Sequence, residues 1–223
     1  IKMVKLATDI MTSHLTGRPS PVPTLTEKKI PHYGVKMPVF PFKMFPEVDP
    51  VLGPEMRSTG EVLGMSPNVG EAIYKAQEAT QTRLPREGTV LLRVNDMDKP
   101  ELIEVAKGFY ECGFKLMGTG RTYDIMKAAG LPAEKVAKID EGRPNVLDKI
   151  TNKSVNIIIN TPLDEKGLGD DSYIRKAAVK GKIPYFTNMA AAKATVQALK
   201  TIKKNGHLGV KSLQEFHSEI KEQ

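Results

Sequence analysis

The sequence predicts an α/β domain built on a doubly wound, five-stranded parallel sheet. From residue 88 onward, five short apolar segments alternate with longer segments of helical spacing. The helical segments carry recognisable start and stop residues, such as Asp98 before one of them and Gly113 after it. Short apolar strands that alternate with helices are typical of a parallel sheet covered by helices on both faces.

The expected elements follow in chain order. The predicted strands are residues 89–94, 114–117, 136–139, 155–159 and 183–186. A helix capped by Asp98 and ended by Gly113 lies between the first two strands, and Pro100 fits its first turn because that position needs no N–H. The other predicted helices are residues 122–129, 144–152, 171–179, 188–204 and 213–221.

The first third of the chain has a different composition. Nine of the 16 prolines fall before residue 55, and proline at this density does not build regular helices or central strands. We therefore expect residues 19–54 to form an extended segment that lies over a surface. A helix over residues 4–15 precedes this segment, a short strand near residues 58–64 follows it, and Ser66-Pro67 begins a helix that continues to Gln81.

Charge and composition exclude several classes of function. The net charge is +7, but Lys and Arg alternate with Asp and Glu, and no basic block exceeds two residues, which argues against a nucleic-acid partner. Apolar runs are too short to span a membrane. The single cysteine, Cys112, allows neither an internal disulfide nor a cysteine zinc site, so no metal site is predicted and a cytoplasmic location is expected.

The loops after the predicted strands are the candidate binding site, because parallel sheets bind ligands at the carboxyl ends of their strands. These loops are residues 95–99, 118–122, 140–143, 160–164 and 187–188. The loop Gly-Thr-Gly-Arg-Thr (118–122) combines two glycines, two hydroxyls and a helix start, which is a suitable arrangement for holding a phosphate. The alternative is an ordinary strand-to-helix turn with a threonine cap.

Other polar side chains are predicted at the same edge. Lys99, Lys138 and Arg143 would bring positive charge, and Asn160 ends the most strand-like run. Asp171 is interpreted as a helix cap. The four histidines all fall outside the strand-end loops, so a histidine acid or base is not expected there. The edge is therefore predicted to bind a ligand and to lack catalytic residues.

Several sequence segments resemble one known family. Residues 45–62, from Phe-Pro-Glu-Val-Asp-Pro to Thr-Gly-Glu-Val, resemble the segment that leaves the second ATP-grasp domain of the carbamoyl phosphate synthetase large subunit. Glu-Gly-Arg-Pro (141–144), Ile-Ile-Asn-Thr (158–161) and Asp-Ser-Tyr-Ile-Arg (171–175) resemble the methylglyoxal-synthase-like domain that ends that subunit. The resemblance divides the chain into a C-terminal remnant of the ATP-grasp domain with a linker, residues 1–81, and a methylglyoxal-synthase-like domain, residues 82–223.

The resemblance implies a regulatory role. In this family the C-terminal domain binds an allosteric nucleoside monophosphate such as UMP or IMP. The matching positions are Lys99, Thr119, Thr122, Lys138 and Asn160, and Arg143 lies nearby in sequence. Thr187 matches a threonine of an ornithine site. Pro162 departs from the family pattern, which often has a threonine there, so one effector contact is expected to be lost.

The resemblance also implies properties of a longer parent protein. The parent would be a glutamine-dependent ligase of pyrimidine and arginine biosynthesis that uses ATP with Mg or Mn, pairs with a glutaminase small subunit and forms oligomers. The present chain would need no cofactor and would not be catalytic alone. Two alternatives remain: a triose-phosphate lyase like methylglyoxal synthase, although the histidines which that enzyme uses are absent here, and a purely structural or oligomerisation domain.

Overall fold

The structure is a computed structural model that describes residues 3–21, 29–39, 60–80, 82–161 and 168–220. The chain divides into two compact units, one of residues 1–31 and 211–223 and one of residues 32–210. The first unit contains α1 (Met3–Thr16) and α8 (Leu213–Ser218). Ser212 begins α8 with a capping box, because its hydroxyl accepts from the Glu215 N–H while the Glu215 carboxylate accepts from the Ser212 N–H.

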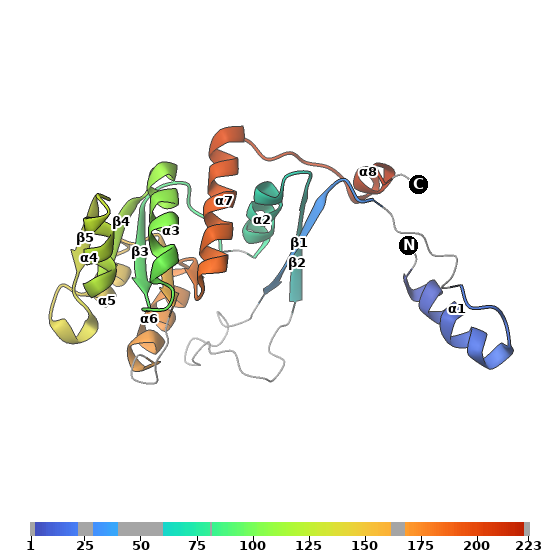
Figure 1. The fold of residues 1–223 in the computed structure, drawn as a ribbon, viewed down its shortest axis with the longest axis horizontal. Helices are drawn as coiled ribbons and strands as arrows, with labels where there is room; N and C mark the ends of the chain where they lie inside the picture. The colour runs from blue at the N-terminus through green and yellow to red at the C-terminus, as the bar shows by residue number, and fades with distance from the viewer. Residues whose placement is uncertain (1–2, 22–28, 40–59, 81, 162–167, 221–223) are drawn as a thin grey trace. The chain divides into compact units, whose positions relative to one another are not determined.

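The second unit contains the predicted five-stranded parallel sheet (Figure 1). Its strands are β3 (Thr89–Val94), β4 (Lys115–Thr119), β5 (Ala133–Val136), β6 (Ile157–Thr161) and β7 (Tyr185–Phe186). They lie in the order β5-β4-β3-β6-β7, and every neighbouring pair is parallel. The predicted fold class is therefore confirmed, and the carboxyl ends of all five strands meet at one edge.

The third strand was predicted in the wrong place. Residues 136–139 were expected to form it, whereas β5 ends at Val136 and Ile139–Glu141 form a 3-10 helix. The strand lies at the end of the sheet and exposes Glu134 and Lys135, so its sequence lacks the continuous apolar run of a central strand. This shift places Lys138 just beyond the strand end.

Helices cover both faces of the sheet. They are α3 (Lys99–Cys112), α4 (Gly120–Ala128), α5 (Val146–Thr151), α6 (Leu168–Gly181) and α7 (Met189–Asn205). Side chains from α3, α4 and α7 share one buried core with alternate residues of β3 and β6, and side chains from α5 and α6 share the other. The alternation of strand side chains between faces explains these two cores: Leu92 faces the first and Leu91 faces the second.

The proline-rich segment was expected to be extended, and part of it forms an extended edge strand that the prediction did not specify. β1 (Tyr33–Val39) pairs antiparallel with β2 (Gly60–Ser66). Pro38 is tolerated because a two-stranded ribbon consists of edge strands only. Residues 45–59 of the family-like run, together with Pro162 and Asp164, lie outside the described residues.

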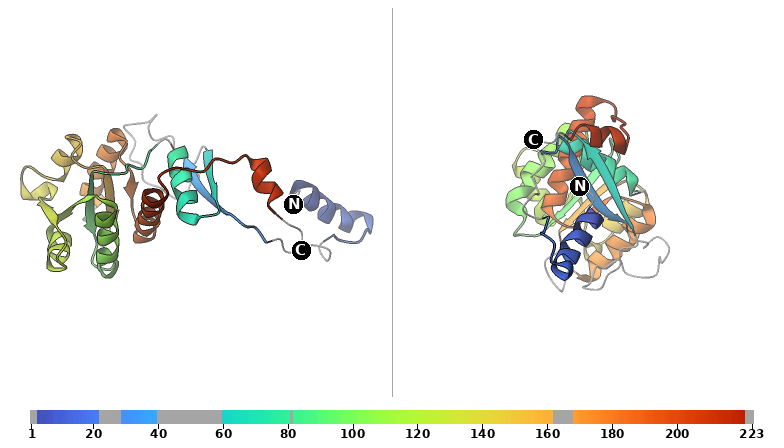
Figure 2. Two further views of the ribbon diagram at one scale, coloured as in Figure 1. Left: turned by 90° about the horizontal axis from the view of Figure 1, so that it is seen from above. Right: turned by 90° about the vertical axis from the view of Figure 1, so that its right-hand side faces the viewer.

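The hairpin continues into α2 (Val69–Ala79), which packs on β2 and on α7. Figures 1 and 2 show α7 between the parallel sheet and α2. Asn68 caps α2, so the helix begins later than the predicted Ser66-Pro67 start. The Glu71 carboxylate accepts from Ser66 Oγ at 3.0 Å and from the Gly209 N–H at 2.9 Å, which ties β2, α2 and the chain after α7 together. The predicted domain boundary at residue 81 remains a prediction.

Candidate functional site

The turn from β4 into α4 is the centre of the candidate site. Thr119 is the N-cap of α4, and Gly120 follows with a positive φ of 41°. A Cβ at Gly120 would lie 3.4 Å from Lys138 Cε and 4.0 Å from its Nζ, so the lysine side chain passes over the start of the helix. Glycine is required here for its left-handed backbone, and its small size also admits Lys138. The structure thus brings Lys138 to residues 118–122, which we call the threonine loop. The predicted phosphate site requires this proximity.

Thr119 has a hydroxyl that the described protein groups leave uncommitted. The residue is 4% exposed, and its side chain makes no capping hydrogen bond to α4. No other hydrogen bond of this hydroxyl is found among the described residues. The hydroxyl is not one of the buried polar atoms that lack a partner, so it keeps access to solvent, and a ligand atom or water can bond to it. The free N–H groups in the first turn of α4 begin at the same point.

Thr122 is committed to the fold through its hydroxyl. Its Oγ1 accepts from the Val94 N–H at 3.2 Å and donates to the Val94 carbonyl oxygen at 3.3 Å. The side chain therefore fastens the first turn of α4 to the end of β3. What Thr122 can still offer an anion is its backbone N–H, which is one of the unpaired donors at the start of the helix.

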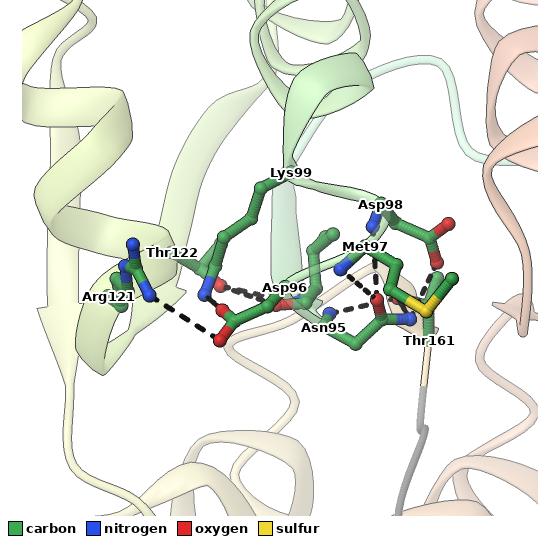
Figure 3. A network of polar contacts seen from close by, with 9 residues as sticks. Asn95, Asp96, Met97, Asp98, Lys99, Arg121, Thr122 and Thr161 are labelled. Carbon is green, nitrogen blue, oxygen red and sulfur yellow. Dashed lines mark hydrogen bonds and ion pairs between the residues drawn. The ribbon is translucent and has the colours of Figure 1, made fainter.

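Lys99, Arg121 and Asp96 form a second group at this edge, which we call the outer network (Figure 3). Lys99 Nζ contacts Asp96 Oδ1, and Arg121 Nη1 lies 3.4 Å from Asp96 Oδ2. The Lys99 side chain is only 13% exposed, whereas those of Asp96 and Arg121 are 69% and 71% exposed. Burial lowers the pKa of Lys99 from its ordinary value, and the nearby Arg121 charge lowers it further.

The loop that carries Asp96 is held by its neighbour Asn95. Asn95 Oδ1 accepts from the N–H groups of Met97 and Asp98 at 2.8 and 3.0 Å. Asn95 Nδ2 donates to Asp98 Oδ2 at 2.7 Å and to Thr161 Oγ1 at 3.0 Å, as Figure 3 shows. These bonds pin the loop between β3 and α3 to the end of β6. Asp98 is the N-cap of α3 as predicted, but its carboxylate binds Asn95 and makes no cap bond.

Asn160 belongs to a buried group that we call the inner network: Arg93, Asn160, Asp171 and Tyr185. Asn160 Oδ1 accepts from Arg93 Nη1 at 3.3 Å, and its Nδ2 donates to Asp171 Oδ1 at 3.1 Å and to Tyr185 Oη at 2.6 Å. Both ends of the amide are therefore engaged within the protein. Burial raises the pKa of the Tyr185 hydroxyl.

Asp171 was interpreted as a helix cap, and this interpretation is wrong. α6 begins at Leu168, so Asp171 lies within the first turns of the helix. Its side chain is 1% exposed and forms an ion pair with Arg93 on β3. Arg93 is the residue that the sequence reasoning missed. A charged residue inside the otherwise apolar run Thr89–Val94 was the available signal, because such a residue needs a buried partner.

The register of the sheet shows where the inner network lies relative to Thr119. Leu92 pairs with Gly118, and Arg93 pairs with Asn160. Thr119 follows Gly118, so Thr119, Arg93 and Asn160 form one row across β4, β3 and β6. Residues in one row point to the same face of the sheet. The inner network therefore begins one strand away from the uncommitted hydroxyl of Thr119.

Two predicted residues, Arg143 and Thr187, make no hydrogen bond or ion pair with residues 118–122 in the part of the chain that the structure describes. The Arg143 side chain is exposed, and its Nη1 lies 3.7 Å from Asp148 Oδ1 on α5. Thr187 is exposed at the end of β7, three strands from β4 in the sheet order. Neighbouring strands are about 4.8 Å apart, so Thr187 would serve a different site.

Searches for metal and membrane features found neither within the described ranges. No group of three or more His, Cys, Asp or Glu side chains there could hold a metal ion. No helix in the described part is long and apolar enough to cross a bilayer.

Comparison with known proteins first defines the class. The family model of the MGS-like domain matches residues 101–187, which include β4 to β7 and the threonine loop. A methylglyoxal synthase structure from Elizabethkingia anophelis NUHP1 aligns with 51% of this chain and 79% of its own, at 20% identity and a TM-score of 0.41. The sheet and the family match together define an α/β protein that contains an MGS-like domain.

Sequence relatives then give the particular protein family. The carbamoyl phosphate synthase large chain, C-terminal section, of Aquifex aeolicus is 47% identical over 86% of this chain and 36% of its own length. The large chain of Methanosarcina barkeri is 40% identical over 100% of this chain and 55% of its own. That of Acidobacterium capsulatum is 41% identical over 98% of this chain and 20% of its own. The predicted resemblance to carbamoyl phosphate synthase large chains is therefore confirmed, and the chain spans about half or less of these relatives.

Proposed function

We propose that the chain is a regulatory part of a carbamoyl phosphate synthase large chain, and that it binds a nucleoside monophosphate such as UMP or IMP at the carboxyl edge of its sheet. The phosphate would bind at the start of α4. Thr119 would donate its hydroxyl, the first turn of α4 its N–H groups, and Lys138 and Lys99 their positive charge. ATP-dependent synthesis with Mg or Mn, and pairing with a glutaminase small subunit, would belong to the longer parent protein.

The observation that carries this proposal is the uncommitted hydroxyl of Thr119. It belongs to a residue that is 4% exposed at the positive end of a helix, beside a glycine over which Lys138 passes. The fold commits the comparable hydroxyl of Thr122 to Val94 and both ends of the Asn160 amide to the inner network. The free donors of Thr119 and of the first turn of α4 thus lie beside Lys138, whose ion pair with Glu141 is half exposed and 3.5 Å long, and a phosphate could bond to both.

Asn160 and Arg143 have weaker places in this proposal. Asn160 would have to exchange a bond within the inner network for a bond to the effector. Arg143 would have to leave Asp148, which is feasible because the arginine is exposed and the pair is long at 3.7 Å. An ornithine site at Thr187 would need carboxylates from another part of the parent protein.

Calorimetric titration with UMP and IMP tests the proposal. The chain should bind at least one of them, and Thr119→Ala should weaken that binding by about 10- to 150-fold, which corresponds to about 1.5–3 kcal/mol for a hydrogen bond to a charged group. Thr151→Ala is the matched control, because Thr151 is exposed at the far end of α5. Absence of heat with both nucleotides would count against the proposal, and methylglyoxal made from dihydroxyacetone phosphate would support the lyase alternative.

A further inference from the structure

In the outer network, Lys99 is much more deeply buried than the carboxylate of Asp96 that pairs with it. Lys99 is a largely buried cation, with a side chain 13% exposed. A buried ammonium group requires a counter-charge or hydrogen-bond acceptors. Among the described residues, its ion-pair partner is Asp96, whose side chain is 69% exposed. A mostly buried cation thus depends on a carboxylate that is free to turn into solvent.

The same carboxylate also holds Arg121. One Asp96 oxygen contacts Lys99 Nζ, and the other lies 3.4 Å from Arg121 Nη1 (Figure 3). Arg121 is the second residue of α4, immediately after Gly120 in the threonine loop. The carboxylate therefore bridges two cations in the way that a phosphate would, at the start of the helix proposed to receive one.

We propose that Asp96 is a built-in competitor: its carboxylate occupies the anion position between Lys99 and Arg121, and a phosphate-bearing ligand must displace it. This inference rests on the proposed function and assigns Arg121 as a further ligand contact. The loop geometry allows the exchange, because Asn95 fixes the loop backbone through Met97, Asp98 and Thr161 while the Asp96 side chain stays exposed.

Competition with Asp96 would favour ligands that carry more negative charge than a single carboxylate. The exposed Asp96–Arg121 ion pair contributes little, and a phosphate would supply Lys99 with the counter-charge that it needs, so a stronger anion displaces Asp96. A phosphate monoester carries a charge of about −1.5 to −2 near pH 7 and three acceptor oxygens, whereas a carboxylate carries one charge and two oxygens. Asp96 therefore leaves the site open to phosphate monoesters and excludes simple carboxylates. Burial, and after it the charge of Arg121, lowers the pKa of Lys99 in the free protein, and a bound phosphate would offset the repulsion between these two cations.

Titration of Asp96→Asn with UMP, IMP and inorganic phosphate tests the inference. The variant keeps the size of the side chain and removes its charge. We expect it to bind the effective nucleotide about fivefold more tightly than the unchanged chain, because the competing ion pairs are lost. Acetate should inhibit nucleotide binding more strongly in the variant than in the unchanged chain.

Glu111→Gln is the matched control. Glu111 forms an exposed 2.7 Å ion pair with Lys200 at the far end of α3, so this variant makes the same change in net charge away from the strand ends. Its affinity should stay within about twofold of the unchanged chain.

Three outcomes distinguish the competitor role of Asp96 from the proposed nucleotide-binding function. Tighter binding by Asp96→Asn alone supports the competitor. Equal or weaker binding by Asp96→Asn, with normal binding by the unchanged chain, overturns the competitor and leaves the proposed function intact, since Asp96 would then only position Lys99. No binding by any of the three proteins overturns the proposed function and the competitor together.

Discussion

The inner and outer networks lie at the same edge of one sheet, yet they differ in how deeply their side chains are buried. In the inner network, Asp171 is 1% exposed and Arg93 is 21% exposed, and the Asn160 amide is engaged at both ends. In the outer network, Asp96 and Arg121 are more than two-thirds exposed. Ion pairs in these two settings have different consequences, because burial strengthens the pair and makes an unpaired member costly.

The comparison teaches that polar residues at a strand end need not belong to a binding site. The inner network joins β3, β6, β7 and α6, so its members act as structural connections. The outer network joins two loops through a carboxylate that solvent can reach. In the described part of the chain, the outer network and the Thr119 hydroxyl are within reach of a ligand from solvent, whereas the one unpaired oxygen of the inner network, Asp171 Oδ2, is buried.

The largest effect is expected when the inner network is broken. Arg93→Met leaves the Asp171 carboxylate buried without its cation, which should lower the free energy of unfolding by about 3 kcal/mol. Urea unfolding followed by circular dichroism measures this change. Arg83→Met is the matched control, because Arg83 is exposed and its ion pair with Glu78 is long, at 3.9 Å. This variant should change the free energy of unfolding by less than about 0.5 kcal/mol. Equal stability of the two variants would contradict the structural role of the inner network.

An intermediate loss of stability is expected when the Thr122 hydroxyl is removed. The same variant shows whether this hydroxyl stabilises the fold or binds the nucleotide. Thr122→Val keeps the shape of the side chain but leaves the buried Val94 N–H without its acceptor, which should cost about 1–2 kcal/mol of stability. Nucleotide affinity, measured by calorimetry on the folded variant, should fall by less than about threefold, since the backbone N–H remains available. A loss of affinity as large as that of Thr119→Ala would show that the Thr122 hydroxyl binds the ligand directly.

The positions of strands and helices along the chain could be predicted in outline because their signals are local. Gly113 ends α3 with a φ of 100°, as its position after an apolar helix predicted. Apolar runs located the four better-buried strands to within two or three residues. β5 and β1 were missed or misplaced because an edge strand alternates polar and apolar residues and tolerates proline.

The residues of the candidate site could be predicted in part. Topology alone places Thr119, Lys138 and Lys99 at one edge, since parallel strands end together. Their pairing depends on tertiary contacts that leave no local signal. Neither the bridge of Asp96 to Arg121, 25 residues away in sequence, nor that of Arg93 to Asp171 follows from residue spacing.

The most direct test of the account is to locate the bound nucleotide by NMR. In a titration of the ¹⁵N-labelled chain with UMP or IMP, the amide signals of Gly118, Gly120 and Thr122 should shift most, together with those of Asp96 and Lys99. The amides of Gly34 and Gly64 in the β1–β2 hairpin should stay within error. Shifts centred on the hairpin or at the amino ends of the strands, or no shifts at saturating nucleotide, would contradict the claim that an anion binds at the start of α4.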